Sequence, residues 1–333
     1  MNVAMLLAWL NRAVIFGAII MYGAMGETLT EKSGNMNLGT PGTMCVGGAL
    51  GFVGAYSYEL SAGTVNPAVV IIISLLCAFV GGALCGVIFS VLTTTLKVNQ
   101  NVVGLALTIF GSGLARFLGA FVIPEGTTTV KAAACNEVFN TKLSIAGTNT
   151  ITKIFLDYGF MLYLAIVLAI VMAYFLKKTR SGLNLRAVGE NPATADAAGI
   201  NVTRYKYLAT IIGSGIAGLG GVYYILDYNY GGWSTFAGES IEALGWLAVA
   251  LVIFASWKPL NLLWGSLIFG VAYWLYNYIS AFGNISLSSA QSSLLEAVPY
   301  LVTIFVLILA SVRKSREGRG PASLGLTYFR EDR

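Results

Sequence analysis

The chain has no histidine among its 333 residues, and only 11% of them are charged. The missing histidine excludes His-dependent acid–base catalysis and any metal site built on imidazole. A soluble domain is about a quarter charged. The low charge, together with 56% hydrophobic residues and a mean hydropathy of +0.75, therefore indicates an integral membrane protein with small extramembrane parts. The net charge of +5 does not indicate nucleic-acid binding, because the Lys and Arg residues sit beside the apolar segments.

Cysteine is also scarce, with four residues in the chain. Cys45, Cys77 and Cys85 lie in apolar segments, and Cys135 lies in a polar stretch. This spacing offers neither a disulfide framework nor a CxxC metal site. The sequence also lacks a GxxxxGK[ST] motif, so it contains no P-loop of its own for nucleotide phosphates.

One glycine motif does occur, a GxGxxG over residues 213–218. It lies inside an apolar segment with no strand before it, which argues against a dinucleotide site. Gly213, Ala217 and Gly221 recur every fourth residue and form a ridge of small side chains. Such a ridge predicts close packing between membrane helices.

Nine apolar segments are long enough, or nearly long enough, to cross a bilayer, since about 20 apolar residues span its hydrocarbon core. They cover residues 3–24, 38–58, 66–92, 101–123, 154–176, 207–226, 243–257, 260–281 and 294–312. Gly39, Pro41 and Gly42 interrupt the second, and the seventh is short, so both are candidates for broken or partial crossings. The expected fold class is all-α, a polytopic membrane protein of eight to ten helices.

The distribution of Lys and Arg predicts the orientation. Twelve of the twenty lie in two segments, residues 177–206 and residues 313–333. The positive-inside rule places both segments in the cytoplasm. Counting spans backwards places residues 124–153 and the N-terminus outside. The expected organisation is a transmembrane domain over residues 1–312 and a cytoplasmic tail over 313–333, in which the stretch KSREGRGPASLG is expected to be disordered.

The hydrophilic loop of residues 177–206 is the most distinctive part of the chain. Asn191 is a good N-cap, and Pro192 suits the first helical position. The alanines that follow favour a helix, and Gly199 ends it. This pattern predicts a two-turn helix surfaced almost entirely by alanine, suited to insertion into a groove on a partner. A solvated connector is the alternative interpretation.

Three motifs resemble one transporter family. The segment RAVGENPATADAAGINVTRYK, residues 186–206, resembles the coupling-helix region of ATP-binding-cassette (ABC) importer permeases of the ribose and branched-chain amino-acid type. GETLTEKSGNMNLG, residues 26–39, and LKVNQNVVGLAL, residues 96–107, are similar to elements of that family's nucleoside and simple-sugar permeases. The chain departs from the family pattern at residues 40–44 and at Thr108, where the family often has an acidic residue and Asn respectively.

The resemblance implies a type II ABC importer permease in the bacterial plasma (inner) membrane, with nucleosides as the expected substrate. It also implies a second permease subunit, in a heterodimer, a cytosolic ATPase that carries the ATP and Mg, and an exterior substrate-binding lipoprotein. The chain itself is then expected to bind no cofactor and to catalyse no reaction. The residues expected to dock on the ATPase are Asn191, Pro192, Ala193, Ala195, Ala198, Gly199 and Ile200. The alternatives are a ribose or other simple-sugar permease, an ion-coupled carrier and a membrane-embedded enzyme.

A polar, glycine-broken stretch leads from the cytoplasmic side into the second span and suggests a substrate pathway. The residues expected to line it are Glu27, Asn35, Asn37, Gly39, Asn99, Gln100 and Asn101. An ordinary loop followed by capped helices is the other interpretation. At the opposite end of the sixth span, aromatic side chains are expected to form an interfacial belt, with stacking on a nucleobase as the second interpretation. These are Tyr223, Tyr224, Tyr228, Tyr230, Trp233 and Phe236.

Overall fold

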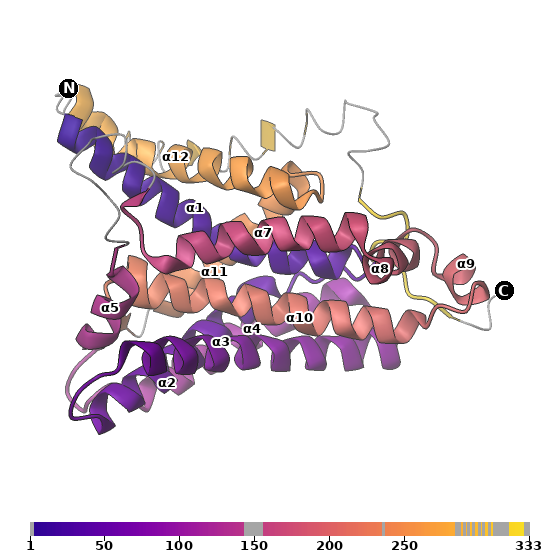
Figure 1. Cartoon of the computed structure of the whole chain (residues 1–333), viewed down its shortest axis with the longest axis horizontal. Helices are drawn as coiled ribbons and strands as arrows, with labels where there is room; N and C mark the ends of the chain where they lie inside the picture. Colours follow the sequence, from indigo (N-terminus) through magenta and orange to yellow (C-terminus); the bar gives the residue numbers. More distant parts are fainter. Residues whose placement is uncertain are drawn as a thin grey trace.

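The structure is a computed structural model that describes residues 3–142, 156–234, 237–283 and 320–329, with scattered positions between 288 and 308. Within these residues the chain is a bundle of long helices (Figure 1). The long helices are α1 (Val3–Glu31), α2 (Thr40–Ser61), α3 (Pro67–Ser90), α4 (Gln100–Ala120), α7 (Phe160–Lys178), α10 (Val202–Tyr223), α11 (Ala237–Phe254) and α12 (Pro259–Gly283). The shorter elements are α5 (Ala133–Asn140), α8 (Arg180–Glu190), α9 (Pro192–Ala197), the π-helical turns Val91–Thr95 and Tyr224–Tyr228, and the strands β1 (Thr129–Lys131) and β2 (Gly232–Ser234).

Six helices in the described part of the chain are long and apolar enough to cross a membrane, and a seventh apolar stretch, Pro259–Leu275, is shorter. The six are Met5–Glu31, Pro67–Thr95, Gln100–Ala120, Phe160–Lys178, Val202–Tyr228 and Ala237–Phe254. The chain is therefore a multi-pass helical membrane protein. Each of the first eight predicted spans overlaps a described helix. Most of the ninth, residues 294–312, lies outside the described residues.

The first two spans differ from the prediction at the point where they meet. Helix α1 continues to Glu31, so the expected loop over residues 24–37 is shortened to a turn. Helix α2 begins at Thr40 with Gly39 before it. Pro41 lies in the first turn, where no intrahelical N–H bond is needed, so it starts the helix instead of interrupting it. Helix α2 is therefore continuous, which contradicts a broken second span. Helix α11, with 18 residues, is among the helices long enough to cross, which contradicts a partial seventh span.

Helix α10 lies against α1, α2 and α3, and the small residues of its GxGxxG motif make this packing close. A Cβ atom added to Gly213 would lie 2.4 Å from the carbonyl oxygen of Gly26 on α1. One added to Gly82 on α3 would lie 2.2 Å from the carbonyl oxygen of Ser214. No side chain fits at either point, which confirms that the motif serves helix packing.

Two of the six aromatic residues expected in the interfacial belt, Tyr223 and Trp233, lie in the core instead. Tyr223 and Trp233 are fully or almost fully buried. Tyr223 lies edge-on to Tyr22 with ring centroids 6.0 Å apart, and Trp233 stacks on Phe52 at 5.7 Å. Strand β2 fixes Trp233, which pairs with Val130 of β1. These rings belong to the core, while Tyr230 is exposed and Phe236 lies outside the described residues.

Cys135 lies on the short helix α5 and is fully buried, although its stretch of the sequence is polar. Its backbone N–H donates to a carboxylate oxygen of Glu59 at 2.9 Å, and its thiol donates to the carbonyl oxygen of Ala55 at 3.4 Å. Burial raises the pKa of the thiol. A polar stretch of sequence thus does not make this thiol accessible.

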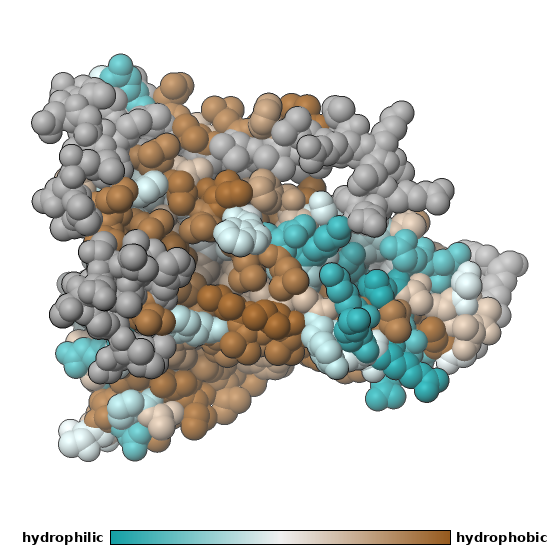
Figure 2. Space-filling view, turned by 45° about the horizontal axis from the view of Figure 1, so that its top comes forward, coloured by the Kyte–Doolittle hydropathy of each residue, from teal (hydrophilic) through white to brown (hydrophobic). Residues whose placement is uncertain are grey.

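The two ends of the bundle have different chemistry. The start of α1 lies at the end opposite α8 and α9 (Figure 1). Figure 2 shows hydrophobic side chains along the body of the bundle and hydrophilic ones gathered at the end that carries α8 and α9. We call this end, with α8, α9 and residues 320–329, the coupling end. The opposite placement of the N-terminus matches the predicted parity, and which end faces the cytoplasm stays a prediction.

Candidate functional site

The coupling end begins where α7 gives way to two short helices. The Thr179 hydroxyl accepts a hydrogen bond from the N–H of Gly182 at 3.0 Å and so caps α8, which the sequence analysis did not predict. The Asn191 side chain caps α9 by accepting from the N–H of Thr194 at 3.0 Å, with Pro192 at the first helical position. Gly199 follows with a φ of +81°. This start and stop agree with the predicted helix.

Helix α9 has one anchored face and one free face. Ala195 is 3% exposed and packs with Val188 and Val202, so it faces the protein and not a partner. The expectation of an almost uniformly free alanine surface was therefore wrong at this position. The exposed positions on and just after α9 are Ala193, Thr194, Ala197, Ala198 and Gly199. All of them are small, and α9 projects at the edge of the bundle (Figure 1).

Residues Gly320–Phe329, which we call the C-terminal strap, pack across the coupling end. The Ser323 N–H and hydroxyl both donate to the carbonyl oxygen of Gly189 on α8, at 3.0 and 2.5 Å. The Gly325 N–H donates to the carbonyl oxygen of Gly34 in the α1–α2 turn at 3.1 Å. The expected disorder of the tail was thus wrong for residues 320–325, and residues 314–319 lie outside the described part.

The far end of the strap reaches α9 and the α3–α4 connection. The Tyr328 hydroxyl donates to a carboxylate oxygen of Asp196 at 2.9 Å. The Lys97 ammonium lies 4.1 Å from the ring centroid of Phe329. Lys97 adopts a φ of +59°, which is uncommon for a residue with a side chain. The strap therefore connects α8, α9, the α1–α2 turn and the α3–α4 connection.

The predicted pathway residue Glu27 is 1% exposed and stabilises the α1–α2 turn. One carboxylate oxygen accepts from the N–H of Asn37 at 3.0 Å, and the other accepts from the hydroxyl of Thr40 at 2.5 Å. The Asn37 side chain accepts from the N–H of Gly39 at 2.9 Å. Glu27, Asn37 and Gly39 are thus brought together in one buried network, and their role in a substrate pathway stays a prediction.

The remaining predicted pathway residues divide into buried and exposed groups. Asn35 is 1% exposed and donates to the hydroxyl of Thr210 on α10 at 3.0 Å. Gln100 is 3% exposed and accepts from the N–H of Met36 at 2.6 Å. Asn99 and Asn101 are exposed, and Asn99 caps α4 by accepting from the N–H groups of Asn101 and Val102. The structure therefore gives most of these side chains a local structural partner.

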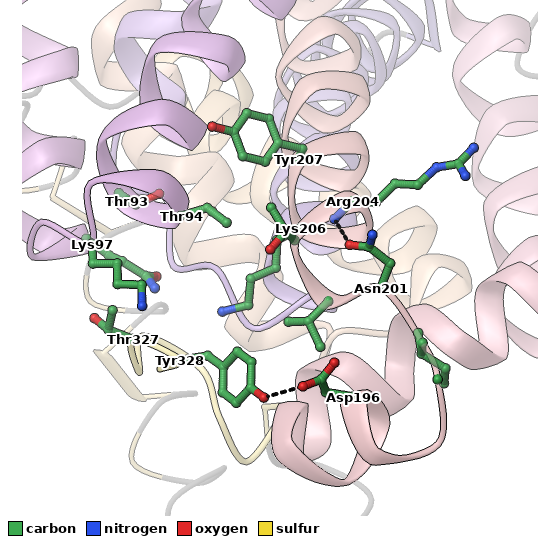
Figure 3. Close-up of a pocket in the computed structure, with 15 residues that line it drawn as sticks. Thr93, Thr94, Lys97, Asp196, Asn201, Arg204, Lys206, Tyr207, Thr327 and Tyr328 are labelled. Carbon is green, nitrogen blue, oxygen red and sulfur yellow. Dashed lines mark hydrogen bonds between the residues drawn. The ribbon is translucent and has the colours of Figure 1, made fainter. Parts of the chain in front are cut away.

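Two cavities flank the connection from α9 to α10, residues 198–201. One, of about 670 Å³, lies between this connection, the strap and the α3–α4 connection (Figure 3). The other, of about 870 Å³, is lined mainly by apolar side chains of α1, α7, α8 and α10. The base of α9 is thus bordered by space on two sides, and the sequence pattern gave no sign of either cavity.

Comparison with known proteins places this architecture in a family. The protein-family model described as the permease component of the branched-chain amino acid transport system matches residues 9–310. The chain belongs to that family. It is therefore a permease subunit of an ABC transporter, as the three sequence motifs predicted.

Three relatives match most of this chain. A protein of Haloferax volcanii, provisionally named a glucose ABC transporter permease, is 30% identical over 97% of both chains. The nucleoside ABC transporter permease protein NupC of Lactococcus lactis is 30% identical over 89% of this chain and 90% of its own. The guanosine ABC transporter permease protein NupQ of Bacillus subtilis is 28% identical over 88% and 89%. Permeases named for nucleosides and for a sugar thus have similar likeness to this chain.

Proposed function

We propose that the chain is a membrane subunit of an ATP-driven importer of nucleosides. The observation that carries this proposal is the end-to-end similarity to two permeases named for nucleoside and guanosine transport. The motifs at residues 26–39 and 96–107, which resemble nucleoside permeases, support it. In the structure these two motifs meet, because Gln100 of one accepts a hydrogen bond from Met36 of the other.

The chemistry of the bundle suits a neutral substrate. Glu27 and Glu31, the two carboxylates buried in α1, already accept hydrogen bonds from groups of this chain, Glu31 from the indole N–H of Trp257. They are therefore not free to hold a charged substrate. A nucleoside is neutral and presents a flat base and sugar hydroxyls, which aromatic and Asn or Thr side chains can contact. A zwitterionic amino acid would need charges or helix ends facing its two termini.

We further propose that α9 docks on a cytosolic ATPase that holds ATP and Mg, and that a second, different permease completes the membrane unit. Support for the docking is the free face of small side chains on an otherwise anchored helix. Support for the second permease is that another Lactococcus lactis protein, NupB, also named a nucleoside ABC transporter permease, is 26% identical over 74% of this chain. Substrate would arrive from a binding lipoprotein outside the cell.

Uptake by the complete complex tests the substrate. Cells that lack other carriers and express the complex are supplied with radiolabelled guanosine, adenosine, uridine, ribose or glucose. We expect uptake of nucleosides, with purine nucleosides preferred, and no competition by ribose or glucose. A matched strain whose partner ATPase cannot hydrolyse ATP serves as the control and should take up nothing.

A sugar permease is the second candidate, because the relative provisionally named for glucose transport covers the chain as completely as any of the three. Uptake of glucose or ribose that no nucleoside competes away would support this candidate and contradict the nucleoside proposal. Uptake that an uncoupler abolishes while ATP is maintained would instead favour an ion-coupled carrier.

A further inference from the structure

Two lysine side chains, Lys97 and Lys206, point into the 670 Å³ pocket at the coupling end. Lys206, near the start of α10, is 3% exposed, and Figure 3 shows its ammonium group pointing into the pocket. Lys97 points into the same space from the α3–α4 connection, whereas Arg204 points away from it. Among the residues that the structure describes, no hydrogen bond or ion pair reaches the Lys206 ammonium. The side chain is otherwise enclosed by protein, so an ammonium that opens only into this pocket favours a negatively charged partner there.

The described residues around Lys97 and Lys206 do not supply enough negative charge to neutralise the two ammonium groups. Among the described residues that line the pocket, Asp196 is the single carboxylate, and it accepts the hydrogen bond of the Tyr328 hydroxyl. Lys97 is held by a strained backbone conformation and by the ring of Phe329, neither of which cancels its charge. The pocket thus keeps a positive potential in the described structure.

The rest of the wall carries hydrogen-bonding groups. Hydroxyl side chains come from Thr93 and Thr94 of the π-helical turn Val91–Thr95, where the Thr93 hydroxyl donates to the carbonyl oxygen of Phe89, and from Thr327 of the strap. Gln100 contributes an amide. The Thr94 hydroxyl oxygen has no hydrogen-bond partner among the described residues. Two ammonium groups beside several hydroxyls suit a group with several anionic oxygens better than a single carboxylate. The volume lies within the range of about 300–1,000 Å³ that is usual for small-molecule sites, which leaves room for more than the anionic group.

We propose that this pocket binds a phosphate monoester, with Lys206 and Lys97 holding the phosphate oxygens. The ligand bridges the C-terminal strap to the base of α9, because Thr327 and Tyr328 form one wall and Gly199, Ile200 and Asn201 form another. Occupancy of the pocket therefore fixes the segment from which the proposed coupling helix projects. The proposal rests on the proposed function only in placing the pocket on the cytoplasmic side. A soluble sugar or nucleoside phosphate and the headgroup of phosphatidic acid share this chemistry.

Binding to the reconstituted complex tests the proposal. Radiolabelled ribose 5-phosphate is titrated onto the complex in nanodiscs of phosphatidylcholine, with ribose as the competitor that lacks the phosphate. We expect binding that ribose does not displace, and a loss of affinity of about tenfold or more in Lys206→Met, which keeps the size of the side chain. Lys206→Arg keeps the charge and should retain binding. Lys178→Met, an exposed neighbour of the coupling end outside the pocket, removes the same charge and should bind as wild type.

A second arm distinguishes the two sources of the phosphate. If ribose 5-phosphate does not bind, but phosphatidic acid in the nanodisc raises the melting temperature of wild type and not of Lys206→Met, the ligand is the lipid. The proposal is overturned if Lys206→Met binds ribose 5-phosphate and is stabilised by phosphatidic acid as wild type is. It is also overturned if neither probe binds to or stabilises any sample. If the ATPase no longer binds the Lys206→Met permease, a carboxylate of the ATPase is the group that Lys206 contacts. That outcome also overturns the phosphate proposal.

Nucleoside uptake by the same complex, measured in proteoliposomes, separates this inference from the proposed function. Phosphate binding without nucleoside uptake would count against the substrate assignment alone. Nucleoside uptake without phosphate binding that depends on Lys206 would count against the pocket alone.

Discussion

At the scale of single residues, buried polar side chains at the coupling end serve the backbone around them. Glu27 shows this most clearly, since its two oxygens accept from Asn37 and Thr40 on both sides of the α1–α2 turn. The turn carries free N–H groups that no helix or sheet satisfies, and in a membrane bundle these need a partner inside the protein. A carboxylate at the end of α1 supplies two acceptors at once.

Replacing Glu27 should therefore affect stability before it affects substrate affinity. We expect Glu27→Ala to lower the melting temperature of the purified permease, because the buried N–H of Asn37 would be left unpaired at a cost of about 1–3 kcal/mol, while the Thr40 hydroxyl keeps the carbonyl oxygen of Asn37 as an acceptor. Glu27→Gln keeps one acceptor and should have a smaller effect. Asn101→Ala, at an exposed position near the same turn, is the control and should melt as wild type.

The same experiment separates this structural role from the predicted pathway role. Glu27→Ala protein with an unchanged melting temperature and a raised KM for uptake would show that the carboxylate contacts substrate. Scanning calorimetry or tryptophan fluorescence, with uptake in proteoliposomes, provides both measurements.

At the scale of elements, α9 and its surroundings show which structural features can be predicted from the sequence. The Asn191-Pro192 start and the Gly199 stop depend on local backbone chemistry, so they could be predicted correctly. Helix α8 contains two glycines, which disfavour a helix, although Thr179 caps its start and Leu185 and Val188 share its buried face. The strap was missed because a short segment rich in Gly, Pro and Ser is held by distant residues, Gly189 and Gly34, which sequence spacing does not reveal.

Long-range packing also explains the other differences from the prediction. Tyr223 and Trp233 are typical of a membrane interface by composition. Tyr22 packs against Tyr223 in the core, and the β1–β2 pair and Phe52 hold Trp233 there. Ala195 looked interchangeable with Ala193 and Ala197 because all three are alanines. Its burial depends on Val188 and Val202, which approach it only in the folded loop.

The distinction between the two faces of α9 leads to a prediction. We expect Ala197→Arg to abolish substrate-stimulated ATPase activity of the reconstituted complex and to leave the permease folded, because a long charged side chain on the free face prevents close docking. Ala195→Arg should instead lower the melting temperature, since it places a charge among Val188 and Val202. Ala322→Arg, at an exposed position of the strap outside both cavities, is a control for an added charge nearby.

The two arginine variants should therefore differ in the property that changes: ATPase stimulation for Ala197→Arg and melting temperature for Ala195→Arg. Normal stimulation of the ATPase by an Ala197→Arg complex would show that α9 is a passive connector. Equal melting temperatures for Ala195→Arg and wild type would show that the anchored face of α9 is not packed as described.

At the scale of the whole molecule, the positions of the two ends of the bundle and of the Lys and Arg residues predict the orientation in the membrane. The N-terminal end of α1 and the coupling end lie at opposite ends of the bundle (Figure 1). Lys and Arg are concentrated in residues 177–206 and 313–333, which contribute α8, α9 and the strap to the coupling end. The positive-inside rule then places the coupling end in the cytoplasm, and α5 with the β1–β2 pair outside.

This orientation can be measured with engineered cysteines. The buried thiol of Cys135 cannot report it, so the four native cysteines are first replaced, and Ala133→Cys or Ala193→Cys is introduced at an exposed position. Ala133 is two residues from Cys135 on α5, and Ala193 is on α9. We expect a membrane-impermeant maleimide to label Ala133→Cys in intact cells without an outer barrier, and Ala193→Cys only after the membrane is opened. A protein with Cys135 as its single cysteine should stay unlabelled in both conditions while it is folded. The reverse pattern for Ala133→Cys and Ala193→Cys would place α9 outside the cell, where no cytosolic ATPase can reach it, and would contradict both the orientation and the proposed coupling.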